Sequence, residues 1–123
     1  MTSLAGTWRI TVMDRWDQDD VDLVGPAFIE FDKRGQGQFQ FIAVEGGMDY
    51  VHGERNGLPC VEFTWIGHDD GEPTSGRGWA RLEKDGSLSG HIYFHLGEDS
   101  GFKAILFKKG RPAAKAAAKR KSR

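Results

Sequence analysis

The sequence predicts an all-β protein, an eight-stranded antiparallel up-and-down barrel (a meander) followed by a flexible basic tail. Three observations favour this fold class. Glycine is frequent (17 of 123 residues), proline is rare (four) and aromatic residues make up 11%, a composition typical of short strands joined by tight turns. Eight apolar or alternating stretches follow one another at about the 8-to-12-residue spacing of a sandwich or barrel. Pairing the last stretch with the first would remove both exposed sheet edges.

In chain order, the predicted strands are residues 7–13, 27–32, 37–44, 48–55, 60–67, 76–83, 87–95 and 101–109. Between the first two, the stretch "RWDQDDVDL" (15–23) indicates a short helix. The predicted barrel domain spans residues 1–109, and residues 110–123, rich in alanine and lysine, form a low-complexity tail.

Two predicted turns assign the faces of the middle strands. "RNGL" (55–58) carries the Asn-Gly pair that is typical of a two-residue type I′ hairpin. "EGGM" (45–48) is interpreted as a second two-residue turn through its glycines, which would place Tyr50 opposite Ala43. Because side chains alternate along a strand, one face then becomes almost wholly apolar and is the predicted core. Its residues are Phe39, Phe41, Ala43, Met48, Tyr50, His52, Val61, Phe63 and Trp65.

A third turn, "EKDGS" (83–87), decides where the two histidines of "SGHIYFHLG" (89–97) point. A three-residue loop with Gly86 in the left-handed conformation gathers the apolar side chains of both strands on one face. His91 and His95 then lie on the outer face. The predicted inward residues of the remaining strands include Trp8, Ile10, Val12, Ile29, Phe31, Leu82, Leu88, Ile92, Phe94, Phe102 and Leu106.

The barrel interior is one candidate site, because an eight-stranded barrel either is filled by side chains or holds one small ligand. Small residues that are predicted to point inward would leave room for a ligand, and these are Ala27, Ala43, Gly78, Ala80, Gly90 and Ala104. A few polar groups in an apolar cavity are the usual composition of a small-molecule site. The candidate ligand-binding residues are Tyr50, His52, Trp65, Phe41 and Phe63. In the alternative, Tyr50 and His52 are core residues whose polar atoms bond to each other, to backbone or to buried water.

The outer face of the last three strands is a second candidate site. Its large side chains, flanked by arginines, are typical of a protein interface. The candidate interface residues are Trp79, His91, Tyr93, Ile105 and Phe107. The simplest assembly is a two-fold homodimer, which His91 and His95 would make pH-dependent because histidine titrates near neutrality. In the alternative, these residues are scattered surface hydrophobic side chains, which are normal individually.

No residue pattern favours an enzyme, a metal or a cofactor. His91 and His95 are separated by about 13 Å along one strand, too far to share one metal ion. "HDDGE" (68–72) lacks the spacing of a calcium loop and fits a solvated hairpin tip. The single cysteine, Cys60, has no histidine base on its own face. With no secretion signal or membrane-spanning stretch in the sequence, we expect a non-enzymatic cytoplasmic protein without a membrane partner.

The net charge of −1 conceals an asymmetry. Residues 110–123 carry six basic and no acidic residues, so residues 1–109 carry 11 basic against 18 acidic. Lysines and arginines of the tail could contact phosphates of nucleic acid, but so short a tail neutralises few of them. We therefore expect at most a weak nucleic-acid contact through the tail.

The N-terminal "GTW" (6–8), together with the eight-stranded meander, resembles the calycin superfamily of lipocalins, fatty-acid-binding proteins and avidin-like barrels. In lipocalins, a G-x-W tryptophan on the first strand packs across one barrel end beneath an arginine that follows the last strand, and a long loop covers the open end. Trp8 matches that tryptophan, and residues 14–26 match the loop. The candidates for its basic partner are Lys108, Lys109 and Arg111. The resemblance covers about residues 5–109.

Stretches such as "WDQDD" and "VEFTWIG" are also similar to a group of short bacterial proteins of unassigned function.

Two functional hypotheses remain. The first is a binding module for a small apolar or aromatic ligand inside the barrel. The second is a solid barrel that binds a protein, or dimerises, through the outer face of its last three strands.

Overall fold

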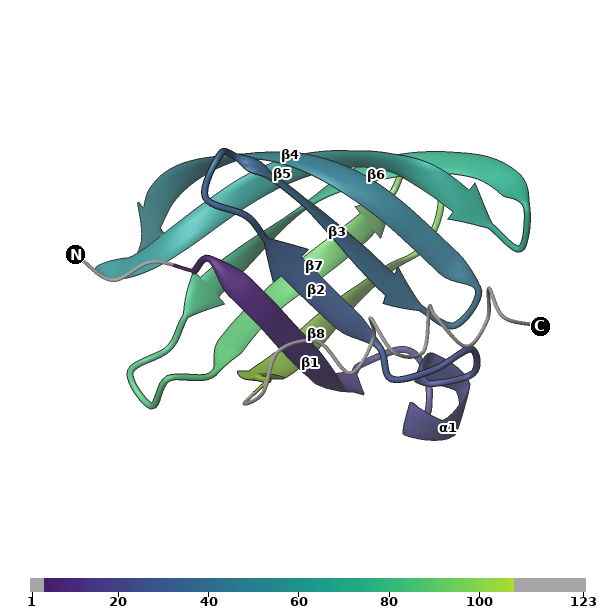
Figure 1. Cartoon of the computed structure of the whole chain (residues 1–123), viewed down its shortest axis with the longest axis horizontal. Coiled ribbons are helices and arrows are strands. Elements are labelled where there is room, and N and C mark those ends of the chain that lie inside the picture. The colour runs from purple at the N-terminus through teal and green to yellow at the C-terminus, as the bar shows by residue number, and fades with distance from the viewer. Residues whose placement is uncertain (1–3, 108–123) are drawn as a thin grey trace.

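Eight antiparallel strands follow one another in chain order, and the last pairs with the first to close a barrel (Figure 1). The computed structural model describes residues 4–107. The strands are β1 (Gly6–Met13), β2 (Phe28–Phe31), β3 (Gln36–Phe41), β4 (Val44–Arg55), β5 (Leu58–Asp69), β6 (Glu72–Leu82), β7 (Leu88–Phe94) and β8 (Asp99–Leu106), and the helix α1 (Gln18–Val21) lies between β1 and β2. The predicted fold class and the short helix are confirmed. The predicted tail (110–123) lies outside the described residues.

Side chains that alternate along the strands fill the barrel, as the two-residue period of a strand requires. The largest fully buried side chains include Leu4, Ile10, Ile29, Phe31, Phe39, Phe41, Val61, Leu88 and Ile92. In Figure 1, β4, β5 and β6 arch along the top of the barrel, and α1 lies at its lower right end. The core is therefore enclosed on all sides by one continuous sheet.

Two of the three predicted turns are confirmed. Asn56 and Gly57 have left-handed backbone (φ 52° and 79°), as a type I′ turn requires, and β4 pairs with β5 from Arg55 onward. In the turn at 83–87, Gly86 has a φ of 90°, and β6 pairs with β7 in the predicted register. The predicted outward direction of His91 follows from this register, and His95, which lies beyond the end of β7, is exposed.

The third predicted turn is wrong. Phe41 pairs with Val44, so the β3–β4 turn lies at residues 42–43 and the glycines at 46–47 lie inside β4. Tyr50 therefore lies beyond the paired part of β3, and its predicted position opposite residue 43 is not found. Because both versions of the turn contain two residues and differ by an even number of positions, every side chain of β4 keeps its predicted face.

A β-bulge in β1 changes which residues face inward near the end of that strand. The register of β1 against β8 shifts between Ile10 and Val12. As a result, Val12 is 47% exposed and Met13 is buried in its place, so the inward position predicted for Val12 is wrong. Leu106 was also expected inside, but it is 52% exposed because it ends β8 at the rim of the barrel.

The loop after β1 closes one end of the barrel. Val21 of α1 is fully buried, and its carbonyl accepts a hydrogen bond from the Ile42 amide (2.8 Å). The guanidinium of Arg9 donates two hydrogen bonds, of 2.6 and 2.7 Å, to the carboxylate of Asp22. Trp16 packs against the core at this end. These contacts hold the loop in the covering position that the calycin resemblance implies.

Trp8 packs toward the other end of the barrel, where the N-terminal segment covers it. Its indole N–H donates a hydrogen bond to the carbonyl of Leu4 (2.9 Å), and both side chains are buried. The basic residues proposed as partners of this tryptophan, Lys108, Lys109 and Arg111, lie outside the described residues. Leu4 thus contributes to the covering of Trp8 within the described chain.

Candidate functional site

The structure buries four of the five predicted ligand-binding residues and exposes the fifth. The buried four are Phe41, Tyr50, Phe63 and Trp65. His52 pairs with Val61 on the inward side of the β4–β5 hairpin, yet its side chain is exposed. β4 continues past the end of its pairing with β3, so no strand flanks His52 on that side. The predicted interior position of His52 is therefore wrong.

Tyr50 lies at the rim of the core with its polar atom satisfied. Its hydroxyl donates a hydrogen bond to the backbone carbonyl of Asp32 (2.5 Å). Its ring makes edge contacts with the rings of Phe31 and His52, each at a centroid distance of 5.3 Å. Burial, together with the nearby Asp32 carboxylate, raises the pKa of Tyr50 above its ordinary value, so the hydroxyl stays a hydrogen-bond donor. This is the satisfied arrangement that the sequence left open as an alternative.

Aromatic rings occupy the space that the small inward residues were expected to leave. At Gly78 and Gly90, ring atoms of Phe63 and Phe102 lie 2.5 and 2.6 Å from the position that a Cβ atom would take. At Gly46, two rings lie 2.7 and 2.9 Å from that position. Core ring pairs at centroid distances of 5.0 to 6.3 Å are Phe31–Phe63, Phe39–Phe41, Phe39–Trp65, Phe41–Phe94 and Trp65–Phe94. A ligand in this part of the interior would require at least one ring to move.

On the outside of the barrel, two aromatic side chains are stacked with arginines. The guanidinium carbon of Arg55 lies 4.1 Å from the ring centroid of Trp79, and that of Arg81 lies 5.8 Å from it. The guanidinium carbon of Arg77 lies 4.1 Å from the ring centroid of Tyr93. These distances fall within the range of cation–π attraction. The outward sides of β4, β6 and β7 thus carry an ordered set of arginines and rings.

His91 extends this set. Its ring centroid lies 4.6 Å from that of Tyr93, and its Nε2 atom lies 2.5 Å from a carboxylate oxygen of Asp99. The register of β6 and β7 places Trp79 directly beside His91. His95 is exposed further along the same chain segment. The structure therefore brings together Trp79, His91 and Tyr93, three of the five predicted interface residues.

The other two predicted interface residues lie apart from this group. Ile105 is exposed and pairs with Arg9 of β1. On β8, the residue that pairs with His91 is Gly101, so Ile105 lies about 13 Å further along the strand. Phe107 follows the end of β8 and is half-buried. We define the stacked face as Arg55, Arg77, Trp79, Arg81, His91 and Tyr93.

Two open hollows flank Arg77 on the stacked face. One, of about 350 Å³, lies beside Arg55 and Trp79. The other, of about 500 Å³, lies beside Tyr93 and His95. Arg77 lines both hollows, so side chains of a partner could approach it from either side. Neither hollow is lined by Tyr50 or His52, the polar residues of the predicted interior site.

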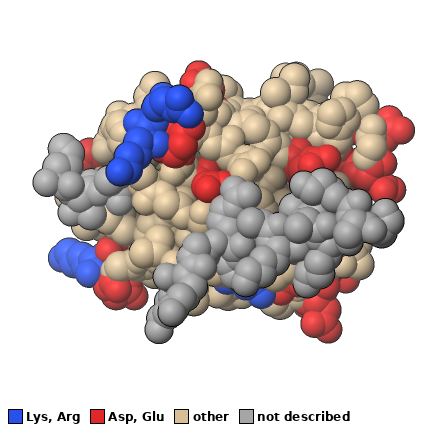
Figure 2. Space-filling model, viewed as in Figure 1, with Lys and Arg blue, Asp and Glu red and all other residues tan. Residues whose placement is uncertain are grey.

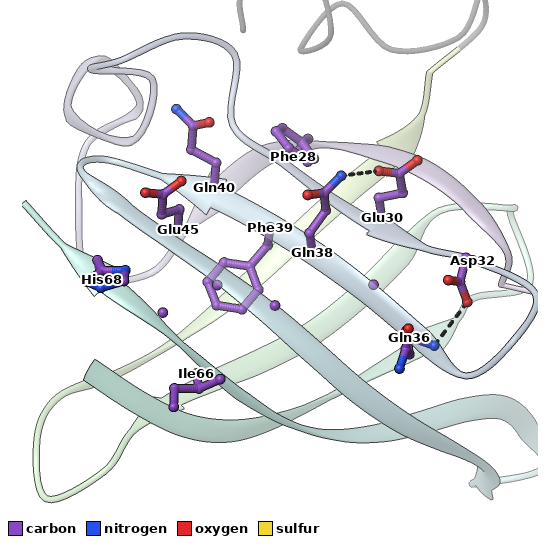
Figure 3. Close-up of a pocket in the computed structure, with 14 residues that line it drawn as sticks. Phe28, Glu30, Asp32, Gln36, Gln38, Phe39, Gln40, Glu45, Ile66 and His68 are labelled. Atoms are coloured by element: carbon purple, nitrogen blue, oxygen red, sulfur yellow. Dashed lines mark hydrogen bonds between the residues drawn. The ribbon is translucent and has the colours of Figure 1, made fainter. Parts of the chain in front are cut away.

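A larger hollow of about 690 Å³ lies on the outer face of β2 to β5 (Figure 3). Sequence reasoning proposed no site here, although the alternating glutamines of "GQGQFQF" (35–41) mark one polar face of β3. We call this hollow the amide groove. Its polar lining side chains are Glu30, Asp32, Gln36, Gln38, Gln40, Glu45 and His68, and no lysine or arginine is among the described residues that line it. Gln38 donates a hydrogen bond to the carboxylate of Glu30 (2.9 Å).

Acidic side chains dominate the surface around this region. Residues 1–107 contain nine lysines and arginines against 18 aspartates and glutamates. Figure 2 shows carboxylates gathered at the end of the barrel where α1 and the β5–β6 turn lie, with few basic side chains on this view. The described part of the chain therefore has a strongly negative surface.

The single cysteine, Cys60, is buried in the described structure. Burial raises the pKa of the Cys60 thiol, and the nearby charge of Arg55 only partly offsets it. No three His, Cys, Asp or Glu residues between positions 4 and 107 lie close enough together to hold a metal ion. Asp69 pairs with Glu72, which confirms the hairpin tip predicted for 68–72. In the same residues, no helix has the length and apolar character needed to cross a membrane.

No protein-family model, curated protein or solved structure matches the chain. The closed eight-stranded antiparallel barrel is consistent with a calycin-like fold. A shared fold does not fix a function, because unrelated functions occupy the same barrel architecture. The function must therefore be argued from the surfaces described above.

Proposed function

We propose that the protein is a non-enzymatic interaction module whose stacked face binds a second copy of the same chain. The proposal rests on the arginine-stacked rings of Trp79 and Tyr93, which lie on the outside of a barrel filled by its own aromatic side chains. Tryptophan, tyrosine and arginine contribute most of the binding energy at protein interfaces. Arginines that already lie on rings lose less side-chain entropy when a partner binds.

Charge on and beside the stacked face supports a second copy as the partner. Asp49 and Glu62 are exposed on β4 and β5, whereas Arg77 lies on β6 and the guanidinium of Arg55 reaches over Trp79 of β6. A two-fold axis parallel to the strands and between β5 and β6 would bring the acidic side of one copy opposite the arginine side of the other. Such a face is complementary to itself, which a symmetric dimer requires.

An exposed apolar side chain on the same outer face would add buried area to this contact. Val51 of β4 is 65% exposed. Val51 pairs with Glu62, beside Trp79. An exposed apolar group bordered by charged side chains is the usual arrangement of an interface core and rim.

A charge exchange tests this proposal. In the two-fold arrangement, Glu62 of one copy faces Trp79 of the other and lies two strand positions from its Arg77. Glu62→Arg and Arg77→Glu each bring like charges close together, whereas the double variant restores opposite charges. We expect the native chain and the double variant to form dimers in sedimentation velocity runs over a concentration series. Each single variant should dissociate at least ~10-fold more readily, because juxtaposed like charges cost several kcal/mol. Glu72→Arg, at the β5–β6 turn outside the stacked face, is the matched control and should leave the dimer unchanged.

Two results would contradict the proposal. One is a native chain that remains monomeric at every concentration, and the other is a double variant that fails to recover the dimer. Native mass spectrometry of the same samples would also reveal a bound small molecule as added mass. Such an adduct would favour the interior binding site that the sequence suggested.

A further inference from the structure

We propose that the amide groove binds the chain's own lysine- and arginine-rich C-terminal segment, residues 108–123. This inference concerns a different surface from the stacked face and does not depend on dimerisation. It rests on the charge of the two parts, on the place where the described chain ends, and on the shape of the groove.

The charges of groove and segment are complementary. Residues 108–123 contain eight of the 17 lysines and arginines and none of the 18 aspartates and glutamates. The charged acids of the groove are Glu30, Asp32 and Glu45, joined by the carbonyl oxygens of its glutamines. Backbone hydrogen bonds from Gln36 and Arg34 hold the pKa of Asp32 below its ordinary value, so this carboxylate is ionised at neutral pH. Lysine and arginine only donate hydrogen bonds and therefore need such acceptors.

The described chain ends close to the edge of the groove. The backbone amide of Phe107 donates a hydrogen bond to the carbonyl of Thr7 (3.0 Å). The hydroxyl of Thr7 in turn donates to the carboxylate of Glu30 (3.1 Å), the residue with which it pairs on β2. Phe107 is thus about two strand spacings, or ~10 Å, from a groove residue. Residues 108–123 span up to roughly 50 Å when extended, which is enough to cross the groove.

Because the segment is covalently attached close to the groove, weak contacts are enough to hold it there. A segment attached beside its site has an effective concentration in the millimolar range. Individual exposed ion pairs are weak, but several of them together can hold a tethered segment at that concentration. We therefore expect docking within one molecule at low salt and its loss at high salt.

The floor of the groove is open where a side chain is absent. Gly47 of β4 lies between Gln38 of β3 and Ile66 of β5 in the sheet. No atom lies within 4 Å of the position that a Cβ atom would take at Gly47. The groove therefore has a gap at Gly47, between Gln38 and Ile66, that a side chain of a docked segment could enter (Figure 3).

Carbodiimide cross-linking of the full chain, followed by peptide mass spectrometry, tests this docking. The reagent joins lysine amines to carboxylates that they touch. We expect links from Lys115 and Lys119 to Glu30, Asp32 or Glu45 in the monomer fraction, and their loss at about 1 M salt, where the screening length falls to ~3 Å. Glu45→Gln should remove its own links, and Glu54→Gln, at an exposed residue away from the groove, is the matched control.

Links spread over exposed carboxylates in general, such as Glu54 and Glu98, would overturn the proposal. So would links found only between two molecules, because the groove would then hold the segment of a second copy. A second measurement does not depend on the reagent. In the variant Lys119→Gln/Arg120→Gln/Lys121→Gln, the backbone amide NMR signals of Gly47 and its neighbours should shift, and those of the distant turn glycine Gly86 should not. Unchanged groove signals would also overturn the docking.

Discussion

Replacing Gly46 by alanine tests whether the barrel interior is full. Gly46 and Gly47 are neighbours on β4 and face opposite sides of the sheet. At Gly46, atoms of Phe39 and Trp65 lie 2.7 and 2.9 Å from the position of the new methyl group, whereas nothing lies within 4 Å at Gly47. The first substitution must push packed rings apart. The second adds a methyl group to an open hollow.

The pair of variants isolates the cost of overpacking. An extra methyl group in a packed core costs about 1–3 kcal/mol. Both substitutions also reduce the conformational entropy of the unfolded chain, worth ~0.4–1 kcal/mol, and this contribution cancels when the two variants are compared. We therefore expect the free energy of unfolding of Gly46→Ala to be about 1–3 kcal/mol below that of Gly47→Ala. Gly47→Ala should be at least as stable as the native chain.

Urea unfolding followed by tryptophan fluorescence and by circular dichroism measures both values. Coincident transitions with equal slopes would show that the two-state analysis applies. In thermal unfolding, the expected difference corresponds to roughly 3–6 °C per kcal/mol for a domain of this size. Equal stability of the two variants would refute the reasoning. It would mean that the rings beside Gly46 can move into free space, and the interior ligand site would again be the better hypothesis.

Three further predictions follow from the described contacts. Met13→Ala should lower the free energy of unfolding by about 2–5 kcal/mol, and Val12→Ala by less than ~1 kcal/mol, because the bulge buries the first side chain and exposes the second. Burial disfavours the charged form of Asp22, but its hydrogen bonds, led by the one from Arg9, outweigh this and lower its pKa below 3.8. The resulting stabilisation is present above that value and is lost as pH falls through the folded-state pKa, so urea titrations should show Asp22→Asn less stable than the native chain at pH 7 and the two converging in acid. Cys60, buried and with a raised pKa, should react with iodoacetamide quickly in urea and slowly in the folded chain, and equal rates would show that the site is open.

The inward and outward faces of the strands could be predicted because they depend only on the alternation of side chains. The β3–β4 turn shows how far this reaches. A Gly-Gly pair was the stronger turn signal, yet the chain turns at Ile42, whose left-handed backbone (φ 54°) is rare for a β-branched residue. The predicted faces of β4 are correct despite this error, since the real turn also has two residues. The predicted residue pairs between β3 and β4 are wrong, because they depend on where the turn begins.

Positions near strand ends were harder to predict, because exposure there depends on neighbouring strands. Val12 continues the apolar alternation of β1, but a bulge against β8 turns its side chain outward. No residue pattern in the sequence predicts this bulge. By the alternation of side chains, His52 falls on the inward face of β4. However, β3 does not extend far enough to pair with this part of β4. Such errors arise from how neighbouring strands pair and where they end, rather than from the local sequence.

The stacked face and the amide groove differ in how far they could be predicted from the sequence. Trp79, His91 and Tyr93 were assigned to one outer face because the turn at 83–87 fixes their register. The stacking of Arg55 on Trp79 joins β4 to β6 across β5, and no sequence spacing indicates a contact of that kind. The amide groove needs Gly47 to lie between Gln38 and Ile66, which becomes evident only once the β3–β4 turn is placed correctly.

The question of an empty or filled interior depends on what pairs with each small residue. Gly78 is paired with Phe63, Gly90 with Phe102 and Gly46 with Phe39, and in every case the ring of the phenylalanine leans over its glycine. An aromatic ring over a cross-strand glycine is a known means of fixing strand register. The space beside these glycines is therefore not free volume, because a neighbouring ring already fills it. The same pairing explains why these small residues do not leave the barrel hollow, and it is the reason for proposing binding surfaces on the outer faces.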